Sequence, residues 1–256
     1  MSDIESLKSQ LLELSHDLGR PEARLAILGE GNTSARVDDD SFLVKASGSE
    51  LRTLSPKQIV RVSAAKCAQL RAEGTLDDAQ ITAGLLDAVV DGPEGVRPSV
   101  ETVMHAALLE LEGVNFVGHT HPTAINQLAC STAFGDPLRK RLFPDHVVVC
   151  GPSAALVPYV DPGLPLAAAV LEAARDYRRQ YGRPPLTIFL QNHGFIALGK
   201  TARQVHQVTL MAVKAAEILS GALAAGGAVY MTDQHVARIA GRDDEHYRQR
   251  MLNQTA

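Results

Sequence analysis

Residues 187–199 read TIFLQNHGFIALG, two short apolar runs separated by Asn192, His193 and Gly194. Aromatic and β-branched residues favour strands, and a polar turn with glycine between two such runs is typical of a β-hairpin. A plain surface turn would more simply use Asn-Gly, yet the tip of this hairpin holds a histidine. His193 is therefore either a turn residue or a ligand that two strands hold in place.

A second apolar run, residues 114–121, reads VNFVGHTH and contains two more histidines. In an extended strand the spacing of two residues puts His119 and His121 on one face, with Val117 behind them, and Pro122 marks the strand end. Such a pair can also be satisfied core or surface histidines. Neutral imidazoles suit zinc and its first-row relatives, and a catalytic site needs three protein ligands. His193 is the best candidate for the third ligand.

Residues 97–110, RPSVETVMHAALLE, open a helix that contains a carboxylate. Ser99 is a candidate N-cap and Glu101 is expected in the first turn, where a glutamate can simply complement the helix dipole. The functional alternative makes Glu101 a general base beside the metal, with Ser99 and the free amides of the helix start holding an anion. His105 lies one turn later on the same face and is either a neighbour of the metal site or a packed residue.

Two loops of small residues and hydroxyls, GEGNTS at 29–34 and KASG at 45–48, let backbone amides approach an oxyanion. Neither has the glycine pattern of a Walker or dinucleotide-binding loop. Lys45 is either an exposed strand lysine or a cation for an anionic substrate. Alternation along the strand predicted at 41–47 puts it on the same face as Ser47.

Strands and helices interleave along the whole chain, which predicts one α/β domain over residues 1–230 and a charged C-terminal tail over 231–256 that docks at a subunit interface. Helices are expected at 3–18, 64–73, 77–90, 166–181 and 202–225, and two short strands in VVVCGPSAALVPY, residues 147–159, around Gly151-Pro152.

The composition excludes several classes of protein. With 256 residues, 45% hydrophobic and 21% charged, the chain is neither disordered nor fibrous. Its formal net charge of -4 favours neither nucleic acid nor an anionic membrane as a partner. Three cysteines without a C-x-x-C pair predict no disulfide framework, and the N-terminus does not resemble a signal peptide. A soluble cytoplasmic protein is the expectation.

In order and spacing, GNTS, KASG, RPSVE-x-x-x-H, GHTHP and NHG resemble the motifs of the class II aldolase/adducin family, most closely those of rhamnulose- and fuculose-phosphate-type aldolases. The resemblance covers roughly residues 5–225. It implies a three-layer α/β/α fold with a central, largely antiparallel sheet, and a homotetramer with active sites between subunits. By motif it assigns the metal to His119, His121 and His193 and catalysis to Glu101. Its phosphate-holding positions are Asn32, Ser47, Gly48 and Ser99. Lys45, which strand alternation puts on the face of Ser47, is a further candidate for binding the substrate.

The implied function is that of a metal-dependent aldolase, a carbon–carbon lyase that cleaves a ketose or ketose 1-phosphate through an enediolate, with Zn²⁺ or another first-row ion such as Mn²⁺ as cofactor. The alternatives are a sugar-phosphate 4-epimerase, dehydratase or decarboxylase on the same metal site, and a non-catalytic adducin-like interaction module. One departure concerns the substrate: Val100 stands where the fuculose type has a second serine. The candidates for a second proton carrier are Tyr159, Tyr230, Tyr247 and Asp145.

Overall fold

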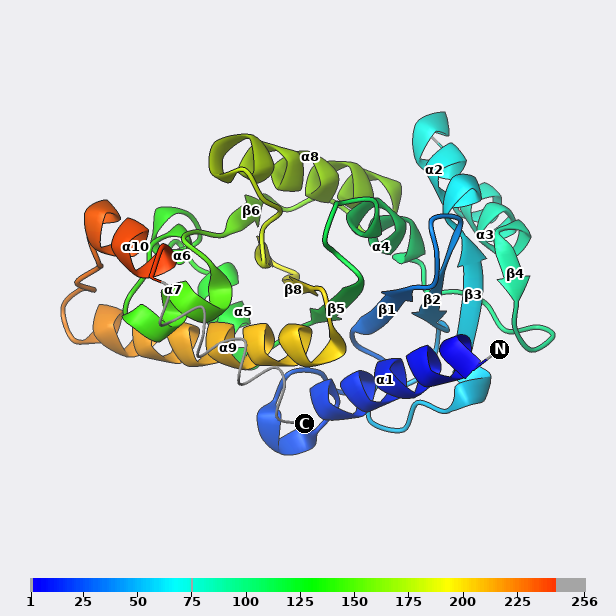
Figure 1. Ribbon diagram of the computed structural model, residues 1–256, viewed down its shortest axis with the longest axis horizontal. Helices are drawn as coiled ribbons and strands as arrows, with labels where there is room; N and C mark the ends of the chain where they lie inside the picture. The colour runs from blue at the N-terminus through cyan, green and yellow to red at the C-terminus, as the bar shows by residue number, and fades with distance from the viewer. Residues whose placement is uncertain (1, 75, 243–256) are drawn as a thin grey trace.

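The computed structural model describes residues 2–74 and 76–242. Eight strands form one sheet in the order β4-β3-β2-β1-β5-β8-β7-β6 (Figure 1). The strands are β1 Asn32–Arg36, β2 Ser41–Lys45, β3 Ile59–Ser63, β4 Val89–Asp91, β5 Phe116–Thr120, β6 Ala155–Val157, β7 Thr187–Leu190 and β8 Gly194–Gly199. Every neighbouring pair is antiparallel except β6 and β7, so the predicted, largely antiparallel sheet is confirmed.

Helices cover both faces of the sheet, as Figure 1 shows. The α-helices are α1 Ser2–Leu18, α2 Ala64–Glu73, α3 Asp78–Asp87, α4 Thr102–Leu109, α5 Thr123–Ala129, α6 Asp136–Arg139, α7 Pro144–Cys150, α8 Leu164–Tyr181, α9 Ala202–Ala224 and α10 Asp233–Ala240, with short 3-10 turns at Pro21–Ala23 and Pro56–Gln58. The helices α2, α3, α4 and α8 lie on one side and α1 and α9 on the other. This arrangement is the predicted three-layer α/β/α fold.

The two faces of the sheet bury separate cores because successive strand residues point to opposite sides. In β2, Phe42 and Val44 belong to the core under α4 and α8, whereas Leu43 belongs to the core under α1 and α9. The same alternation in β5 sends Val117 toward α4 and Phe116 toward α9. The same alternation places His119 on the face of Val117.

Helix α9 is, among the described residues, the one helix long and apolar enough to span a bilayer by length and composition alone. Here Val205, Val208 and Ala212 are buried in the core beneath the sheet. The apolar character of α9 is therefore accounted for by packing against the sheet and the neighbouring α1, α5 and α7.

Two of the expected elements were wrong. The segment VVVC was predicted as a strand but forms the end of α7, where Pro144 occupies the first turn and Val147 and Cys150, three residues apart, are buried. Tertiary packing against α9 therefore overrides the strand propensity of three valines. The helix predicted at 77–90 ends at Asp87, and the following residues Val89–Asp91 pair with β3 as the edge strand β4.

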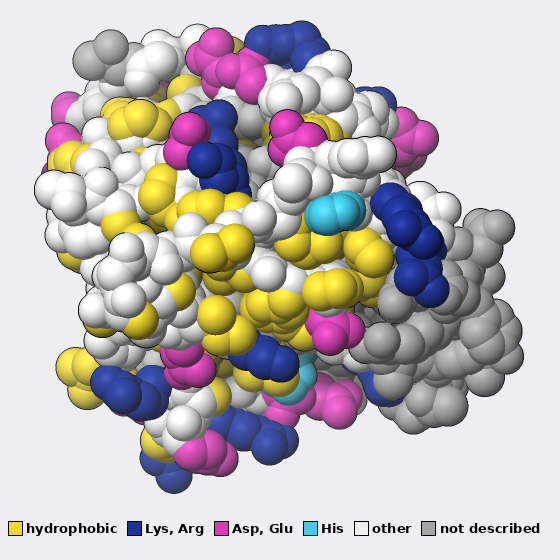
Figure 2. Space-filling view, turned by 90° about the vertical axis from the view of Figure 1, so that its left-hand side faces the viewer, with side chains coloured by type: hydrophobic (Ala, Val, Ile, Leu, Met, Phe, Trp, Pro, Cys, Tyr) yellow, Lys and Arg dark blue, Asp and Glu magenta, His cyan; other side chains and the backbone are white. Residues whose placement is uncertain are grey.

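The described part of the predicted tail, residues 231–242, packs onto the rest of the chain. Residues Asp233–Ala240 form α10, which lies against α7. Figure 2 shows hydrophobic side chains gathered at the centre of the face that Figure 1 presents on its left, with charged side chains around them. The remainder of the predicted tail, residues 243–256, lies outside the described residues, as does Tyr247.

Candidate functional site

Three imidazoles meet at one end of the sheet. His119 is the fourth residue of β5, His121 follows that strand, and His193 lies in the turn between β7 and β8. One ring nitrogen from each lies within 4.8 Å of the others, and the ring centroids are 4.8 to 5.1 Å apart. The structure therefore brings together the three histidines that the sequence singled out.

For two of the three rings, neighbouring groups fix which nitrogen faces the centre. His119 Nδ1 bonds the carbonyl of Phe195 at 3.0 Å, which turns its Nε2 toward His121 Nε2, 3.0 Å away. His121 Nδ1 lies 3.7 Å from Glu30 Oε1. The backbone of His193 is held by Asn126, whose amide donates to the His193 carbonyl at 3.1 Å.

Two glycines allow the strands to approach the cluster this closely. A Cβ on Gly194 would lie 2.6 Å from the Thr120 carbonyl and 2.7 Å from His121 Cδ2. Gly31 has a φ of +72°, and a Cβ there would lie 2.7 Å from the His119 carbonyl. Both positions exclude larger residues because real side chains essentially never make such short contacts.

A carboxylate completes the cluster. Glu101 Oε2 lies 3.4 Å from His119 Nε2, and Glu101 Oε1 lies 3.4 Å from His193 Nε2. Glu101 immediately precedes α4 and so is not inside the first turn as expected. Ser99 is two residues upstream, where its Oγ accepts the Glu101 N–H at 3.3 Å. Pro98, paired with Ala46 across an isolated bridge, anchors this approach to the helix.

The protonation of these groups follows from burial and from their partners. Burial lowers the pKa of His119 and of His193, and it lowers the pKa of His121 to about 4. The three imidazoles are therefore neutral near pH 7. Burial raises the pKa of Glu101, but the facing His119 and the amide of Asn32 outweigh it and lower that pKa to about 2. Burial alone would raise the pKa of Glu101 toward neutrality, and its partners reverse that effect.

The predicted substrate-binding residues divide into two groups. Asn32 and Ser99 are buried and joined to Glu101, since Asn32 Nδ2 donates to Glu101 Oε2 at 2.7 Å and to Ser99 Oγ at 3.2 Å. Ser47 and Gly48 lie in an exposed turn, because β2 ends at Lys45 and the predicted strand does not continue to 47. The Ser47 N–H donates to the Arg97 carbonyl at 2.8 Å, which ties this turn to the segment before Ser99.

Lys45 is buried, only 2% exposed, which contradicts its interpretation as an exposed strand lysine. Its Nζ lies 3.4 Å from the Ala46 carbonyl. Burial lowers the pKa of Lys45 to about 8, while the negative charge of Glu101 raises it. Burying the charge of Lys45 costs free energy even with Glu101 nearby, and a second anion would offset part of that cost. Lys45 is therefore a candidate for contact with a second anion.

Two of the candidates for a second proton carrier, Tyr159 and Tyr230, contact residues outside the histidine cluster. The Tyr159 hydroxyl donates to Asp161 at 3.0 Å, and the Tyr230 ring lies under the Lys140 ammonium, 5.2 Å from its centroid. Asp145 lies in the first turn of α7.

Sequence reasoning missed Glu30, and it left the role of His105 open. Glu30 stands between two glycines in the GEGNTS loop, a pattern that gave no reason to place it beside His121. His105 is fully buried and contacts both Asn32 and Ser34. Its position on the face of Glu101 was the one available signal.

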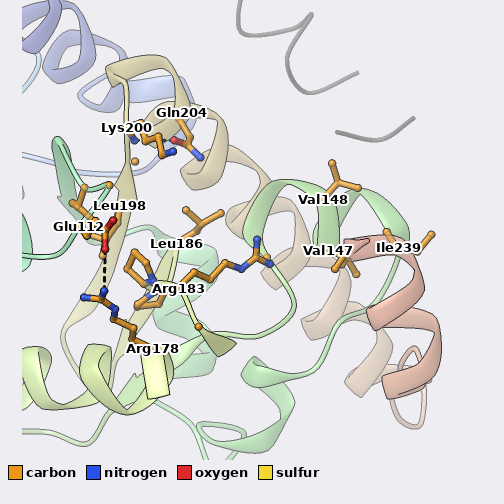
Figure 3. Close-up of a pocket in the computed structure, with 18 residues that line it drawn as sticks. Glu112, Val147, Val148, Arg178, Arg183, Leu186, Leu198, Lys200, Gln204 and Ile239 are labelled. Carbon is orange, nitrogen blue, oxygen red and sulfur yellow. Dashed lines mark hydrogen bonds and ion pairs between the residues drawn. The ribbon is translucent and has the colours of Figure 1, made fainter. Parts of the chain in front are cut away.

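The histidine cluster is separate from a cavity of about 440 Å³ between α7, α8, α10 and the end of β8. Figure 3 shows the residues that line this cavity, including the ion pair of Arg178 with Glu112 at 3.0 Å and the side chains of Arg183 and Lys200. Its lining contains none of the predicted site residues.

Residues 9–220 match the family model of the class II aldolase and adducin N-terminal domain. The chain belongs to this family. Its superfamily depends on a divalent metal ion, and the histidine cluster has the donor set for one. Family members act on sugar phosphates and often form oligomers.

Comparison with individual proteins shows several reactions on this fold. The chain is 27% identical to a 3-oxo-tetronate 4-phosphate decarboxylase of Haemophilus influenzae over 73% of its own length and 76% of the relative's. It is 30% identical to a methylthioribulose-1-phosphate dehydratase of Sorangium cellulosum over half of each chain. The L-fuculose-1-phosphate aldolase of Thermus thermophilus has the same fold, with a TM-score of 0.62 and 19% identity over 87% of this chain and 98% of that one.

Proposed function

We propose that the protein is a metal-dependent carbon–carbon lyase that acts on a hydroxyketone sugar acid or sugar phosphate. The observation that carries this proposal is the convergence of three neutral imidazoles on one carboxylate, with both Glu101 oxygens 3.4 Å from a histidine nitrogen. Three imidazoles with nitrogens directed at one point fit zinc or a related first-row ion. Such an ion, when bound, would polarise the substrate ketone as a Lewis acid.

Glu101 would carry the proton. Asn32 Nδ2 holds Oε2 as a hydrogen-bond acceptor, so a proton taken up by the carboxyl sits on Oε1. A bound anionic substrate expels water and adds negative charge, and both effects raise the pKa of Glu101 from its low resting value. The carboxyl can then pass that proton to the substrate carbon that loses its bond.

Ser99 and Lys45 would bind the anionic part of the substrate. Ser99 Oγ accepts hydrogen bonds from Asn32 Nδ2 and from the Glu101 N–H, which leaves its own hydrogen to be donated. Lys45 supplies a positive charge, and the exposed Ser47–Gly48 turn supplies small residues and backbone amides. Val100 is 58% exposed and offers no hydroxyl to the substrate.

Among lyase reactions, we favour decarboxylation of a 3-oxo sugar acid. The electrons of the bond to the carboxylate carbon pass to the ketone as carbon dioxide leaves, and the carbon that loses the carboxylate then takes one proton. Glu101 suffices for that single transfer. Aldol cleavage also requires a base for the hydroxyl that becomes the aldehyde. The relative that aligns with three quarters of each chain bears the name of a decarboxylase.

Aldol cleavage of a ketose or ketose 1-phosphate is the second candidate, since the order of the five motifs resembles that of the fuculose-type aldolases. It would require a second proton carrier in addition to Glu101. A homotetramer is part of both proposals, and the apolar surface in Figure 2 supports an assembly.

The test is a substrate panel. The protein is freed of metal with a chelator, reloaded separately with Zn²⁺ or Mn²⁺, and incubated with 3-oxo sugar acid phosphates, ketose 1-phosphates and free ketoses. We expect metal-dependent release of carbon dioxide. Aldehyde release without carbon dioxide would favour the second candidate, and epimerisation or loss of water alone would contradict the proposal of a carbon–carbon lyase. His193→Ala should abolish turnover, and His235→Ala, on the exposed surface of α10, is its matched control.

A further inference from the structure

A buried chain of polar side chains leads away from Glu101 into the layer between the sheet and α4. Asn32 and Ser34 are two residues apart on β1 and face the same side, and His105 on α4 lies over both. Ser34 Oγ lies 2.6 Å from His105 Nδ1, and His105 Nε2 bonds Asn32 Oδ1. Ser34 and His105 are fully buried, so the two ring nitrogens have protein partners instead of water.

The direction of the hydrogen bonds along this chain follows from the acceptors at its end. Glu101 Oε2 and Ser99 Oγ both lie beside the same terminal atom of the Asn32 amide, at 2.7 and 3.2 Å. An amide nitrogen has two hydrogens to donate, whereas an amide oxygen facing a carboxylate would be repelled. The nitrogen of Asn32 must therefore face Glu101, and its oxygen must face His105.

The tautomer of His105 follows from this orientation of the Asn32 amide. Asn32 Oδ1 is an acceptor, so His105 Nε2 has to carry the hydrogen. Burial lowers the pKa of His105 to about 3, so the ring is neutral and its Nδ1 bears a lone pair. Ser34 Oγ–H is then the donor to Nδ1. Each of the three bonds therefore has one direction. The carboxylate of Glu101 sets it through Asn32, and the Ser34 hydroxyl, which can donate or accept, completes it by holding Nδ1 of the ring.

We propose that Ser34 and His105 are positioning residues that lock the amide of Asn32 in the orientation that presents its nitrogen to Glu101 and Ser99. This inference rests on the proposed function for its catalytic consequence. Without Ser34 the ring loses its partner at Nδ1 and is free to rotate, so its Nε2–H no longer holds Asn32 Oδ1 in place. The Asn32 amide is then held at one end only, and its nitrogen is less precisely placed as the donor to Glu101 Oε2.

The first test needs no substrate and no metal. In metal-free protein labelled with ¹⁵N at histidine, the His105 nitrogens are assigned by comparison with His105→Gln. We expect an unprotonated Nδ1 and a protonated Nε2 near pH 7, and in Ser34→Ala a shift of the Nδ1 resonance because that nitrogen loses its hydrogen bond. A protonated Nδ1 in the unsubstituted protein, or an unchanged spectrum in Ser34→Ala, would overturn the assignment.

The second test separates positioning from mere stability. Ser15 is the matched control, because it is also fully buried and its Oγ lies 2.6 Å from Thr33 Oγ1 on the same strand, outside the chain that leads to Glu101. In metal-loaded protein we expect Ser34→Ala to lower kcat about fivefold to tenfold with KM changed less than about twofold, the effect of one buried hydrogen bond. Ser15→Ala should lose comparable stability and keep its kcat.

Equal kcat values for the two alanine variants would show that Ser34 is only structural. If no substrate of the panel is turned over, the proposed function fails, and the histidine spectra alone then decide whether Ser34 and His105 fix the Asn32 amide. The two failures are thus distinguishable.

Discussion

Replacing Gly194 with alanine tests the close packing that brings the three histidines together. The new methyl group would lie 2.6 Å from the Thr120 carbonyl, 2.7 Å from His121 Cδ2 and 3.2 Å from His119 Cε1. The Thr120 carbonyl is backbone in the central strand β5, so either β5 and β8 separate or His121 rotates away. Overpacking of this kind costs about 1–3 kcal/mol of unfolding free energy. Because it displaces a ligand, we also expect metal affinity to fall at least about tenfold.

Gly221→Ala is the matched control, since a Cβ at this position in α9 has no atom within 4 Å. Alanine in a helix interior should raise stability by about 0.5–1 kcal/mol. Unfolding free energies are measured in urea by circular dichroism on metal-free protein, and Zn²⁺ binding is measured by isothermal titration calorimetry. Unchanged stability together with unchanged Zn²⁺ affinity in Gly194→Ala would refute the role of close packing at this glycine.

Three further predictions concern charge and metal. Glu101→Gln should keep Zn²⁺ and the fold but lose about 10² to 10⁴-fold in kcat, measured on the substrate found by the panel; unchanged kcat would leave Glu101 with a structural role only. Lys45→Met should be more stable than the unsubstituted protein at pH 7. Burial lowers the pKa of Lys45 from 10.5 to about 8, so burying its charge costs up to about 3 kcal/mol below pH 8. Between pH 8 and 10.5 the unfolded state binds more protons, so native stability rises with pH and the advantage of Lys45→Met in urea unfolding should shrink; an advantage independent of pH would contradict this. Zn²⁺ at one hundred times its Kd should raise the unfolding free energy by about 2.7 kcal/mol over chelated protein, and the same comparison in His193→Ala should show no such gain.

Local patterns in the sequence predicted the cluster of three histidines. The two-residue spacing of His119 and His121 and the strands on either side of His193 depend on neighbours in the chain, so periodicity was sufficient to predict them. The burial of Lys45 depends on how the sheet and α4 pack, and alternation along one strand could not predict it. The same alternation predicted that the strand continues to residue 47, whereas β2 ends at Lys45 and the Ser47–Gly48 turn follows.

Local sequence patterns could not predict contacts between residues that lie far apart in the chain. The contact of His105 with Asn32 and Ser34 requires the placement of α4 over β1, which no local signal specifies. The segment VVVC has the composition of a strand, and its helical state depends on Pro144 and on packing against α9. The low pKa of Glu101 likewise results from partners on other segments, among them His119, Asn32 and His193, which the position of Glu101 at a helix start does not specify.

The most direct test of the central claim is turnover in D₂O of a 3-oxo sugar acid phosphate by the metal-loaded protein, with the product analysed by mass spectrometry. The account predicts release of carbon dioxide and one deuterium on the carbon that held the carboxylate, with both lost on chelation and strongly reduced in Glu101→Gln. Product formed at the same rate after chelation, or with Glu101→Gln as active as the unsubstituted protein, would contradict it.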